Sequence, residues 1–160
     1  MCSETRAEFR HERWDAETLR EFRYDQRISK TMRQHEVELR VRYAETDAMG
    51  FLHHSRYFVY FEIGRTELFR AAGGDYRKME EGGLFLVVAK VECKFKLPIR
   101  YDDLVTLRTT LERVSPAKLE HKYELFRDGE LLATGHSTLG CVDRSGQIQM
   151  MPDFILSPDD

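Results

Sequence analysis

The stretch YAETDAMGFLHH, residues 43–54, decides how this sequence is interpreted. Alternating apolar and polar residues predict a half-buried strand over Val37 to Tyr43, and the apolar run over Ser55 to Ala72 predicts a helix. The stretch therefore places Asp47 in a Gly-containing turn ahead of a helix. Unpaired N–H groups at a helix start can stabilise an oxyanion, and an acid beside them can attack a carbonyl or activate water. The alternative is structural, because an Asp before a helix most often forms a cap or a turn.

The same residues carry a resemblance to a known family. Residues 43–54, followed by the aromatic-rich segment SRYFVYFEIGRTELFR, resemble the signature of hotdog-fold acyl-CoA thioesterases of the 4-hydroxybenzoyl-CoA thioesterase type. Pro98–Asp103 resembles the family's loop between two long strands, and the likeness extends from near Gln34 to Pro152. It departs at residues 51–53, where Phe-Leu-His replaces the family's small aliphatic pair and aromatic residue. That departure leaves the acyl-group preference open.

The resemblance implies a fold, a reaction and an assembly. The fold is α+β, the hotdog fold, with an antiparallel sheet wrapped around one long central helix. The reaction is hydrolysis of an acyl-CoA thioester to a free acid and coenzyme A, without a metal or other cofactor. The family's active site lies between subunits, so a homodimer or homotetramer is expected. The alternatives are an acyl-carrier-protein thioesterase, a hotdog dehydratase, and a non-catalytic acyl-CoA-binding module.

Three residues of the motif are candidate catalytic residues. Asp47 would act as nucleophile or general base, two roles that the sequence does not separate. His54 matches the His of the family motif and would donate a hydrogen bond to the carbonyl or orient the attacking water. Its structural alternative is a His bonded to backbone at the helix start. Tyr43 would orient the substrate or the acid, and its alternative is a strand-end aromatic that fills the core.

Further residues are predicted to contact the substrate. Gly50 belongs to the turn, and backbone N–H groups near His54 and Ser55 are candidates for polarising the carbonyl. Glu62, with Arg65 three residues on, is either a second carboxylate near the thioester or half of an ion pair within the helix or between subunits. The candidates for contacts with the phosphates of coenzyme A are Arg100, Lys118 and Arg144.

The composition suits one soluble domain with a charged surface: 160 residues, 41% hydrophobic and 33% charged. The net charge of −3 gives no basic field for nucleic acid, and no apolar run approaches the roughly 18 residues that span a bilayer. Three widely spaced cysteines and the lack of a secretory signal favour a cytoplasmic protein. Cys93 and Cys141 lie in strand-like patterns and are expected in the core. No metal site is expected, since no Cys or carboxylate lies at ligand spacing from His53 and His54.

Two parts are expected along the chain. Residues 1–33 form a charged extension that the resemblance does not reach, and the hotdog domain is expected over 34–160. Within the extension, Trp14 to Ile28 has a narrow apolar stripe compatible with a helix. The elements predicted after the long helix are a short helix over Asp75 to Glu81, strands over Leu84–Lys96, Leu104–Arg113, Lys118–Arg127 and Leu131–Asp143, a last short strand, and a helical turn over Pro152–Leu156. Gly64 predicts close approach of the long helix to the sheet, and Gly135 and Gly140 predict bulges or bends.

Overall fold

Five segments with alternating apolar residues form a single antiparallel sheet. The structure, a computed structural model, describes residues 33–152 and residue 155. The strands are β1 (Gln34–Arg40), β2 (Leu84–Phe95), β3 (Leu104–Ser115), β4 (Lys118–Arg127) and β5 (Glu130–Asp143). Their order across the sheet is β1-β3-β4-β5-β2, so β1 and β2 form its two edges.

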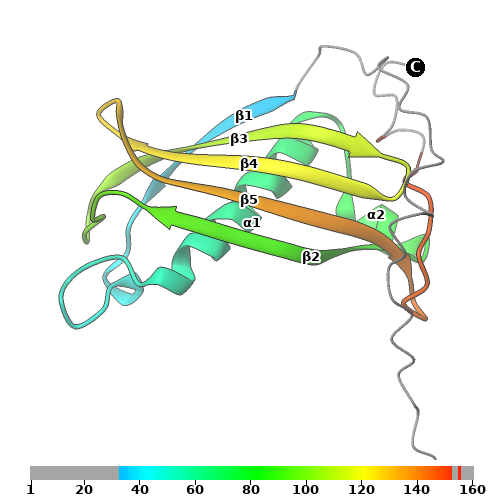
Figure 1. The fold of residues 1–160 in the computed structure, drawn as a ribbon, viewed down its shortest axis with the longest axis horizontal. Coiled ribbons are helices and arrows are strands. Elements are labelled where there is room, and N and C mark those ends of the chain that lie inside the picture. Colours follow the sequence, from blue (N-terminus) through cyan, green and yellow to red (C-terminus); the bar gives the residue numbers. More distant parts are fainter. Residues whose placement is uncertain (1–32, 153–154, 156–160) are drawn as a thin grey trace, which may run out of the picture.

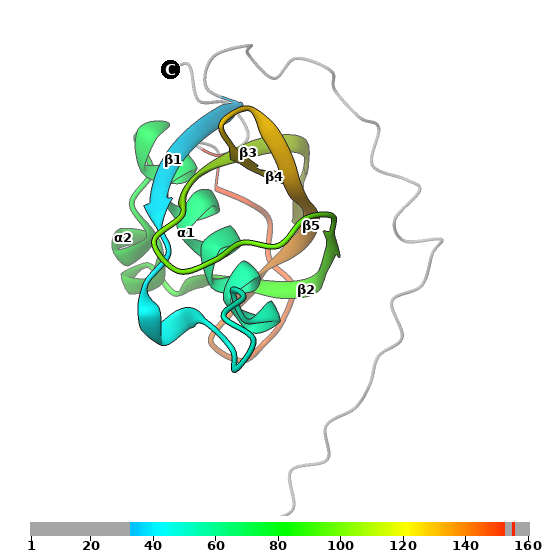
Figure 2. The ribbon, with the colours of Figure 1, turned by 90° about the vertical axis from the view of Figure 1, so that its left-hand side faces the viewer.

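The sheet curves around the long helix α1 (His54–Ala71), and the short helix α2 (Tyr76–Glu81) follows at the far end of α1. Figure 1 shows α1 crossing behind the strands, and the end-on view in Figure 2 shows the sheet bent around it. The buried residues of α1 are Tyr57, Tyr60, Phe61, Gly64 and Leu68. Their spacing of three and four residues puts them on one helix face. The predicted antiparallel sheet wrapped around one long helix is confirmed.

The predicted first strand is too long at its C-terminal end. β1 ends at Arg40, because Val41 leaves the ladder with β3. Its N–H donates to the Asp103 carbonyl and its carbonyl accepts from the Asp102 N–H, both at 3.0 Å. Tyr43–Glu45 then forms a short 3-10 turn.

The other predicted strands are confirmed with ends shifted by two residues or fewer. The last short strand is reduced to a single bridge between Val142 and Ile148. Residues 1–32 and most of the predicted turn 152–156 lie outside the described residues, so the domain boundary stays a prediction. None of the helices described is long and apolar enough to cross a membrane.

Two glycines let α1 lie close against the sheet. A β-carbon at Gly64 would contact Thr109 Oγ1 and lie 2.7 Å from Leu107 Cδ2, so the predicted close approach is confirmed. A β-carbon at Gly135 would contact the Phe61 ring, which stacks on Tyr123 at 4.3 Å between centroids. Of the predicted bulge or bend at Gly135, the bulge is wrong, because the register of β5 is regular there. This glycine makes room for an aromatic ring instead.

Two apolar clusters fill the space between sheet and helices. The first surrounds the N-terminal half of α1 and includes Tyr60, Phe61 and Tyr123. The second includes Met79 of α2 and the C-terminal residues Met151 and Ile155. Cys141 is buried in the second cluster and the partly buried Cys93 packs against the first, which confirms their predicted core positions. Burial raises the pKa of the Cys93 thiol to about 11 and also raises that of Cys141, so both thiols stay neutral.

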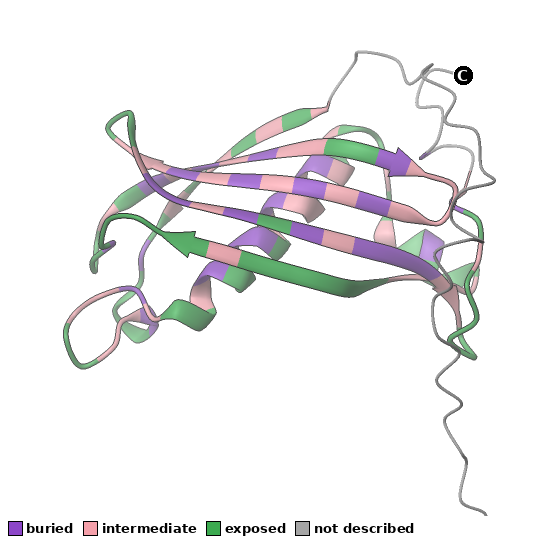
Figure 3. Cartoon of the chain, in the orientation of Figure 1, coloured by how far each residue is buried: buried purple, intermediate pink, exposed green. Residues whose placement is uncertain are grey.

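The edge strand β2 carries apolar side chains that the protomer leaves open. Figure 3 shows exposed residues along most of this strand, whereas β4 and β5 alternate between buried and more exposed positions. The large apolar residues of β2 that are between 38% and 55% exposed are Val87, Val88, Val91 and Phe95. An apolar edge of this kind is a surface suited to pairing with another strand.

Candidate active site

The motif forms a tight loop between β1 and α1. A bridge between Thr46 and Leu52 closes the loop at its base. The Asp47 N–H donates to the Phe51 carbonyl at 2.8 Å, and the Gly50 N–H donates to the Asp47 carbonyl at 2.9 Å. Gly50 has a φ of +77°, a conformation that favours glycine. The amide of Gly50 is therefore used inside the turn.

The Asp47 carboxylate is fixed through one of its two oxygens. Oδ1 accepts hydrogen bonds from the N–H groups of Met49 (2.8 Å) and Phe51 (3.1 Å). Oδ2 has no hydrogen-bond partner among the residues that the structure describes. The structural and chemical interpretations of Asp47 are thus compatible, because one oxygen holds the turn and the other remains available.

The start of α1 lies next to this loop along the chain and begins one residue earlier than predicted. His53 is the N-cap: its Nδ1 accepts from the Ser55 N–H at 3.3 Å and lies 2.9 Å from Ser55 Oγ. The N–H of His54, in contrast, has no acceptor within the described part of the chain. Of the two predicted oxyanion donors, His54 offers a free N–H and Ser55 is engaged by the cap. The exposed ring of His54 lies against His53, with centroids 4.1 Å apart.

A second loop, between β2 and β3, packs against the motif. The Leu52 N–H donates to the Ile99 carbonyl at 2.7 Å, and Phe51 forms a bridge with Arg100. The Arg100 guanidinium lies 4.5 Å from the centroid of the Phe51 ring. The structure therefore brings Arg100 beside the Asp47 loop, although the two are distant in sequence.

The other predicted phosphate contacts lie elsewhere in the protomer. Lys118 begins β4 and Arg144 follows β5, and both strand ends lie at the end of the sheet opposite the Asp47 loop (Figure 1). Glu62 is exposed, and its Oε2 lies 3.4 Å from the Arg65 guanidinium, which agrees with the ion-pair alternative.

The core interpretation of Tyr43 is wrong. Its side chain is 78% exposed, because Tyr43 lies in the 3-10 turn rather than at the end of β1. The ring contacts the exposed Tyr101 edge to face, at 5.6 Å between centroids. Tyr43 therefore remains available on the surface near the motif loop.

Sequence reasoning missed two residues at this site, Glu45 and Tyr60. Glu45 is a buried acid inside the motif, and its carboxylate accepts a hydrogen bond of 2.9 Å from the Tyr60 hydroxyl. The two residues are fifteen positions apart. The local sequence contained one signal for Glu45: its position three residues after Arg42, which resembles the spacing of a capping box.

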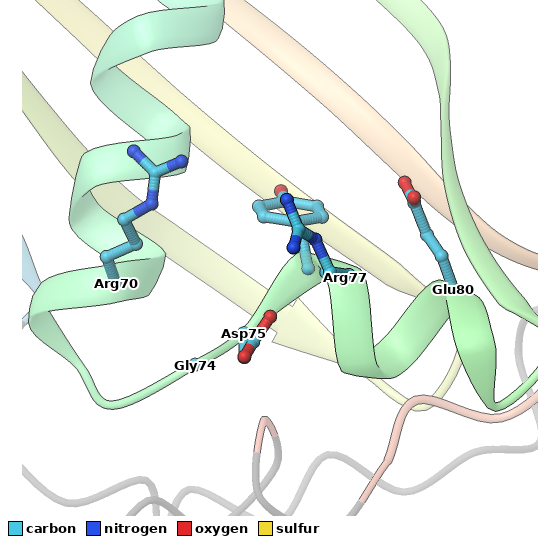
Figure 4. A pocket seen from close by; sticks show the side chains of 6 residues that line it. Arg70, Gly74, Asp75, Arg77 and Glu80 are labelled. Atoms are coloured by element: carbon cyan, nitrogen blue, oxygen red, sulfur yellow. The ribbon is translucent and has the colours of Figure 1, made fainter.

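A surface hollow lies away from the motif. It measures about 550 Å³ and lies between the end of α1 and α2. Figure 4 shows Arg70 from α1 on one side and Arg77 and Glu80 from α2 on the other. Its two arginines are offset by Asp75 and Glu80, so it has no excess positive charge for a phosphate. Among the described residues, no group of three His, Cys, Asp or Glu side chains is placed to hold a metal ion.

Comparison with known sequences places the chain in a family. A family model described as the thioesterase-like superfamily matches residues 41–158. The chain is 31% identical over 106 residues to the acyl-CoA thioesterase YbgC of Haemophilus influenzae, which covers 66% of this chain and 78% of that protein.

Comparison with solved structures agrees. A DHNA-CoA thioesterase from Staphylococcus aureus matches with a TM-score of 0.70 and 31% identity, over 76% of this chain and 82% of that one. A hypothetical protein from Aquifex aeolicus matches with a TM-score of 0.73 and 34% identity, over 76% and 96%. The chain therefore belongs to the thioesterase-like superfamily and has the hotdog fold that the resemblance implied.

Proposed function

We propose that this protein is an acyl-CoA thioesterase, which hydrolyses a thioester to a free acid and coenzyme A. The geometry of Asp47 carries the proposal: Oδ1 is held by two N–H groups, and Oδ2 has no partner in the described part of the chain. The similarity to a relative named acyl-CoA thioesterase supports the substrate class. Unpaired Cys93 and Cys141 fit a reducing compartment, and we assign the reaction to the cytoplasm.

Asp47 acts on the thioester in one of two ways. As a nucleophile, Oδ2 attacks the carbonyl carbon and expels the thiolate of coenzyme A, and water then hydrolyses the resulting anhydride. As a general base, Oδ2 takes a proton from the water that attacks the carbonyl. Both routes consume one water and release one acid and one thiol.

The start of α1 stabilises the charge that develops on the carbonyl oxygen. The free N–H of His54 lies at the positive end of the helix dipole, which favours an anion. One preorganised donor of this kind is worth roughly 3–4 kcal/mol in the transition state. The rings of His54 and Tyr43 are exposed next to the loop and orient the substrate.

Coenzyme A contacts the surface beside the motif loop. Arg100 meets a phosphate, because its guanidinium lies against Phe51 and has no carboxylate partner among the residues described. Gly50 and Ser55 line the approach to Asp47. Lys118 lies at the end of the sheet opposite the Asp47 loop, so it would contact the substrate from the partner subunit, whereas Glu62 is assigned to the ion pair with Arg65.

The partner subunit is a second copy of this chain. The edge strand β2 exposes apolar side chains and unpaired backbone groups, and antiparallel pairing of two β2 strands would cover both. A homodimer of this kind continues the sheet across the two protomers. Two such dimers would form the homotetramer.

Release of free thiol from a panel of thioesters tests the proposal. The panel contains aliphatic and aromatic acyl-CoAs, with acyl carrier protein esters as a separate arm. We expect turnover of at least one acyl-CoA at about 1 s⁻¹ or faster, with equal amounts of acid and thiol. Binding of acyl-CoA without thiol release would instead favour the binding module, and turnover of carrier-protein esters alone would favour the alternative thioesterase.

A further inference from the structure

The motif contains a buried carboxylate that the proposed reaction does not use. Glu45 is only 3% exposed. Its Oε2 accepts from the Arg42 N–H (2.8 Å) and from the Tyr60 hydroxyl (2.9 Å), and its Oε1 accepts from the Arg42 guanidinium (2.8 Å). A buried carboxylate without donors is strongly destabilising, so these three bonds hold its position.

The backbone of Glu45 joins the same elements. Its carbonyl accepts from the N–H of His53, the N-cap of α1, at 2.9 Å, and its N–H donates to the Arg42 carbonyl at 3.0 Å. Tyr60 is 2% exposed and lies inside the first apolar cluster. Glu45 therefore connects the chain after β1, the start of α1 and the core, two residues before Asp47.

The charge states of the pair are fixed at neutral pH. Burial opposes ionisation of Glu45, but hydrogen bonds from Arg42 and Tyr60 outweigh it and hold the pKa of the carboxyl below its usual value. Burial, with the hydrogen bond to Glu45, raises the pKa of Tyr60. Glu45 is thus an anion and Tyr60 a neutral donor, so the bond between them is charge-assisted.

We propose that Glu45 is a positioning residue for the reaction: through Tyr60 and Arg42 it fixes the base of the Asp47 loop relative to the first N–H groups of α1. This inference rests on the proposed function, because it assumes that Asp47 acts on the substrate. Asp47 Oδ2 and the His54 N–H must face the same carbonyl group at the same time. Small displacements between such groups are costly, at about a hundredfold in rate for 1 Å.

The chain offers a matched control for a purely structural role. Tyr123 is also fully buried in the first cluster, and its hydroxyl lies 2.7 Å from Ser137 Oγ. Tyr60→Phe and Tyr123→Phe each remove one hydroxyl and one buried hydrogen bond while keeping the ring. Only the first of these bonds reaches the Asp47 loop.

The test measures kcat and KM by thiol release for both variants, alone and combined with Asp47→Asn, well below the melting temperature. We expect Tyr60→Phe to lower kcat about tenfold with KM within about twofold, and Tyr123→Phe to leave both parameters unchanged. In the Asp47→Asn background, Tyr60→Phe should cause no further loss, because the residue that it positions is already inactive.

Equal kcat for Tyr60→Phe and Tyr123→Phe would overturn the proposal, as would a further tenfold loss in the Asp47→Asn background. Wild-type turnover by Asp47→Asn alone would instead refute the proposed function, so the two failures are distinguishable.

If Tyr60→Phe does not fold, Arg42→Gln replaces it, since the Arg42 side chain is 74% exposed and its loss leaves the core intact. We expect about a threefold fall in kcat for this variant and none in the Asp47→Asn background, and an unchanged kcat would contradict the proposal.

Discussion

The two ends of α1 use their polar groups differently. At the N-terminal end, the His54 N–H and Asp47 Oδ2 have no partners among the described residues, and Tyr43 is exposed. At the C-terminal end, the last carbonyls are occupied: Leu68 accepts from the Ala72 N–H and Phe69 accepts from the Gly74 N–H. The second apolar cluster, with α2 packed beside it, closes that end.

This difference supports our proposal that the reaction takes place at the N-terminal end of α1. A site that stabilises a new negative charge needs donors that the fold leaves unused and holds in place. The N-terminal end of α1 meets this requirement, whereas the hollow at the C-terminal end is lined by side chains of both charges.

Disruption of the β2 edge should strongly reduce activity, since in our proposal the partner subunit completes the site at the N-terminal end of α1. Val91→Glu introduces a charge at an exposed apolar position of β2, where a like charge on the paired strand of a second copy would oppose pairing. We expect light scattering to give the monomer mass and thiol release to fall about a hundredfold or more.

Ile148→Glu is the control for this variant, because Ile148 is 51% exposed but lies after β5 rather than on the β2 edge. It should leave mass and activity unchanged. A fully active Val91→Glu monomer would show that one protomer contains a complete site.

The free energy of unfolding should fall in acid because of His121, a buried residue of β4. Burial, together with the Arg65 guanidinium, lowers the pKa of His121 to about 4 from 6.5, and its Nδ1 has no partner in the described chain. Between these values the unfolded chain binds a proton that the folded chain does not, so stability falls as the pH is lowered from about 6.5 to 4. We expect a loss on the order of 3 kcal/mol, measured by urea unfolding at a series of pH values.

His121→Leu should remove most of that dependence between pH 6.5 and 4, since Leu does not titrate. The same slope in both proteins would show that other groups cause the acid sensitivity.

Packing should be tighter around the N-terminal half of α1 than near the other end. Gly135→Ala places a β-carbon against the Phe61 ring and 2.9 Å from the Glu92 carbonyl oxygen. We expect it to lower the free energy of unfolding by about 1–3 kcal/mol. Gly140→Ala is its matched control in the same strand, because the nearest atom to its β-carbon is the Ala117 carbonyl oxygen at 4.0 Å. Equal stability of the two variants in urea would contradict this difference in packing.

The smallest effect is expected in the hollow at the C-terminal end. Arg77→Ala removes one of its two arginines without touching the Asp47 loop. We expect kcat and KM to stay within about twofold of wild type in the thiol-release assay. A KM raised tenfold would mean that coenzyme A reaches this end of the protomer.

The local sequence pattern was sufficient to predict the strands, the long helix and the turn that contains Asp47. Alternation predicted the strands, the apolar run over 55–72 predicted α1, and Gly64 predicted the close contact of α1 with the sheet. The motif also predicted that Asp47 lies in a turn before the helix.

The errors arose at positions whose conformation or role is determined by tertiary contacts. Tyr43 was assigned to a strand end because the alternation continues past Arg40. In the structure, the backbone of Val41 instead forms hydrogen bonds with the loop between β2 and β3, and β1 stops at Arg40. The role of Gly135 depends on the Phe61 ring, and that of Glu45 on Tyr60, so neither is visible in local sequence. The roles of the predicted site residues stay predictions until activity is measured.

Thiol release from the best acyl-CoA substrate, compared between wild type and Asp47→Asn, shows directly whether Asp47 acts on the thioester. The Asn side-chain oxygen can still accept from the Met49 and Phe51 N–H groups, so the loop should keep its shape. The control is Asp128→Asn in the β4–β5 turn, where the φ of 51° is one that Asn adopts readily. We expect a loss of about a hundredfold or more in kcat for Asp47→Asn and of less than about twofold for the control. Equal thiol release by wild type and a folded Asp47→Asn variant would contradict this expectation.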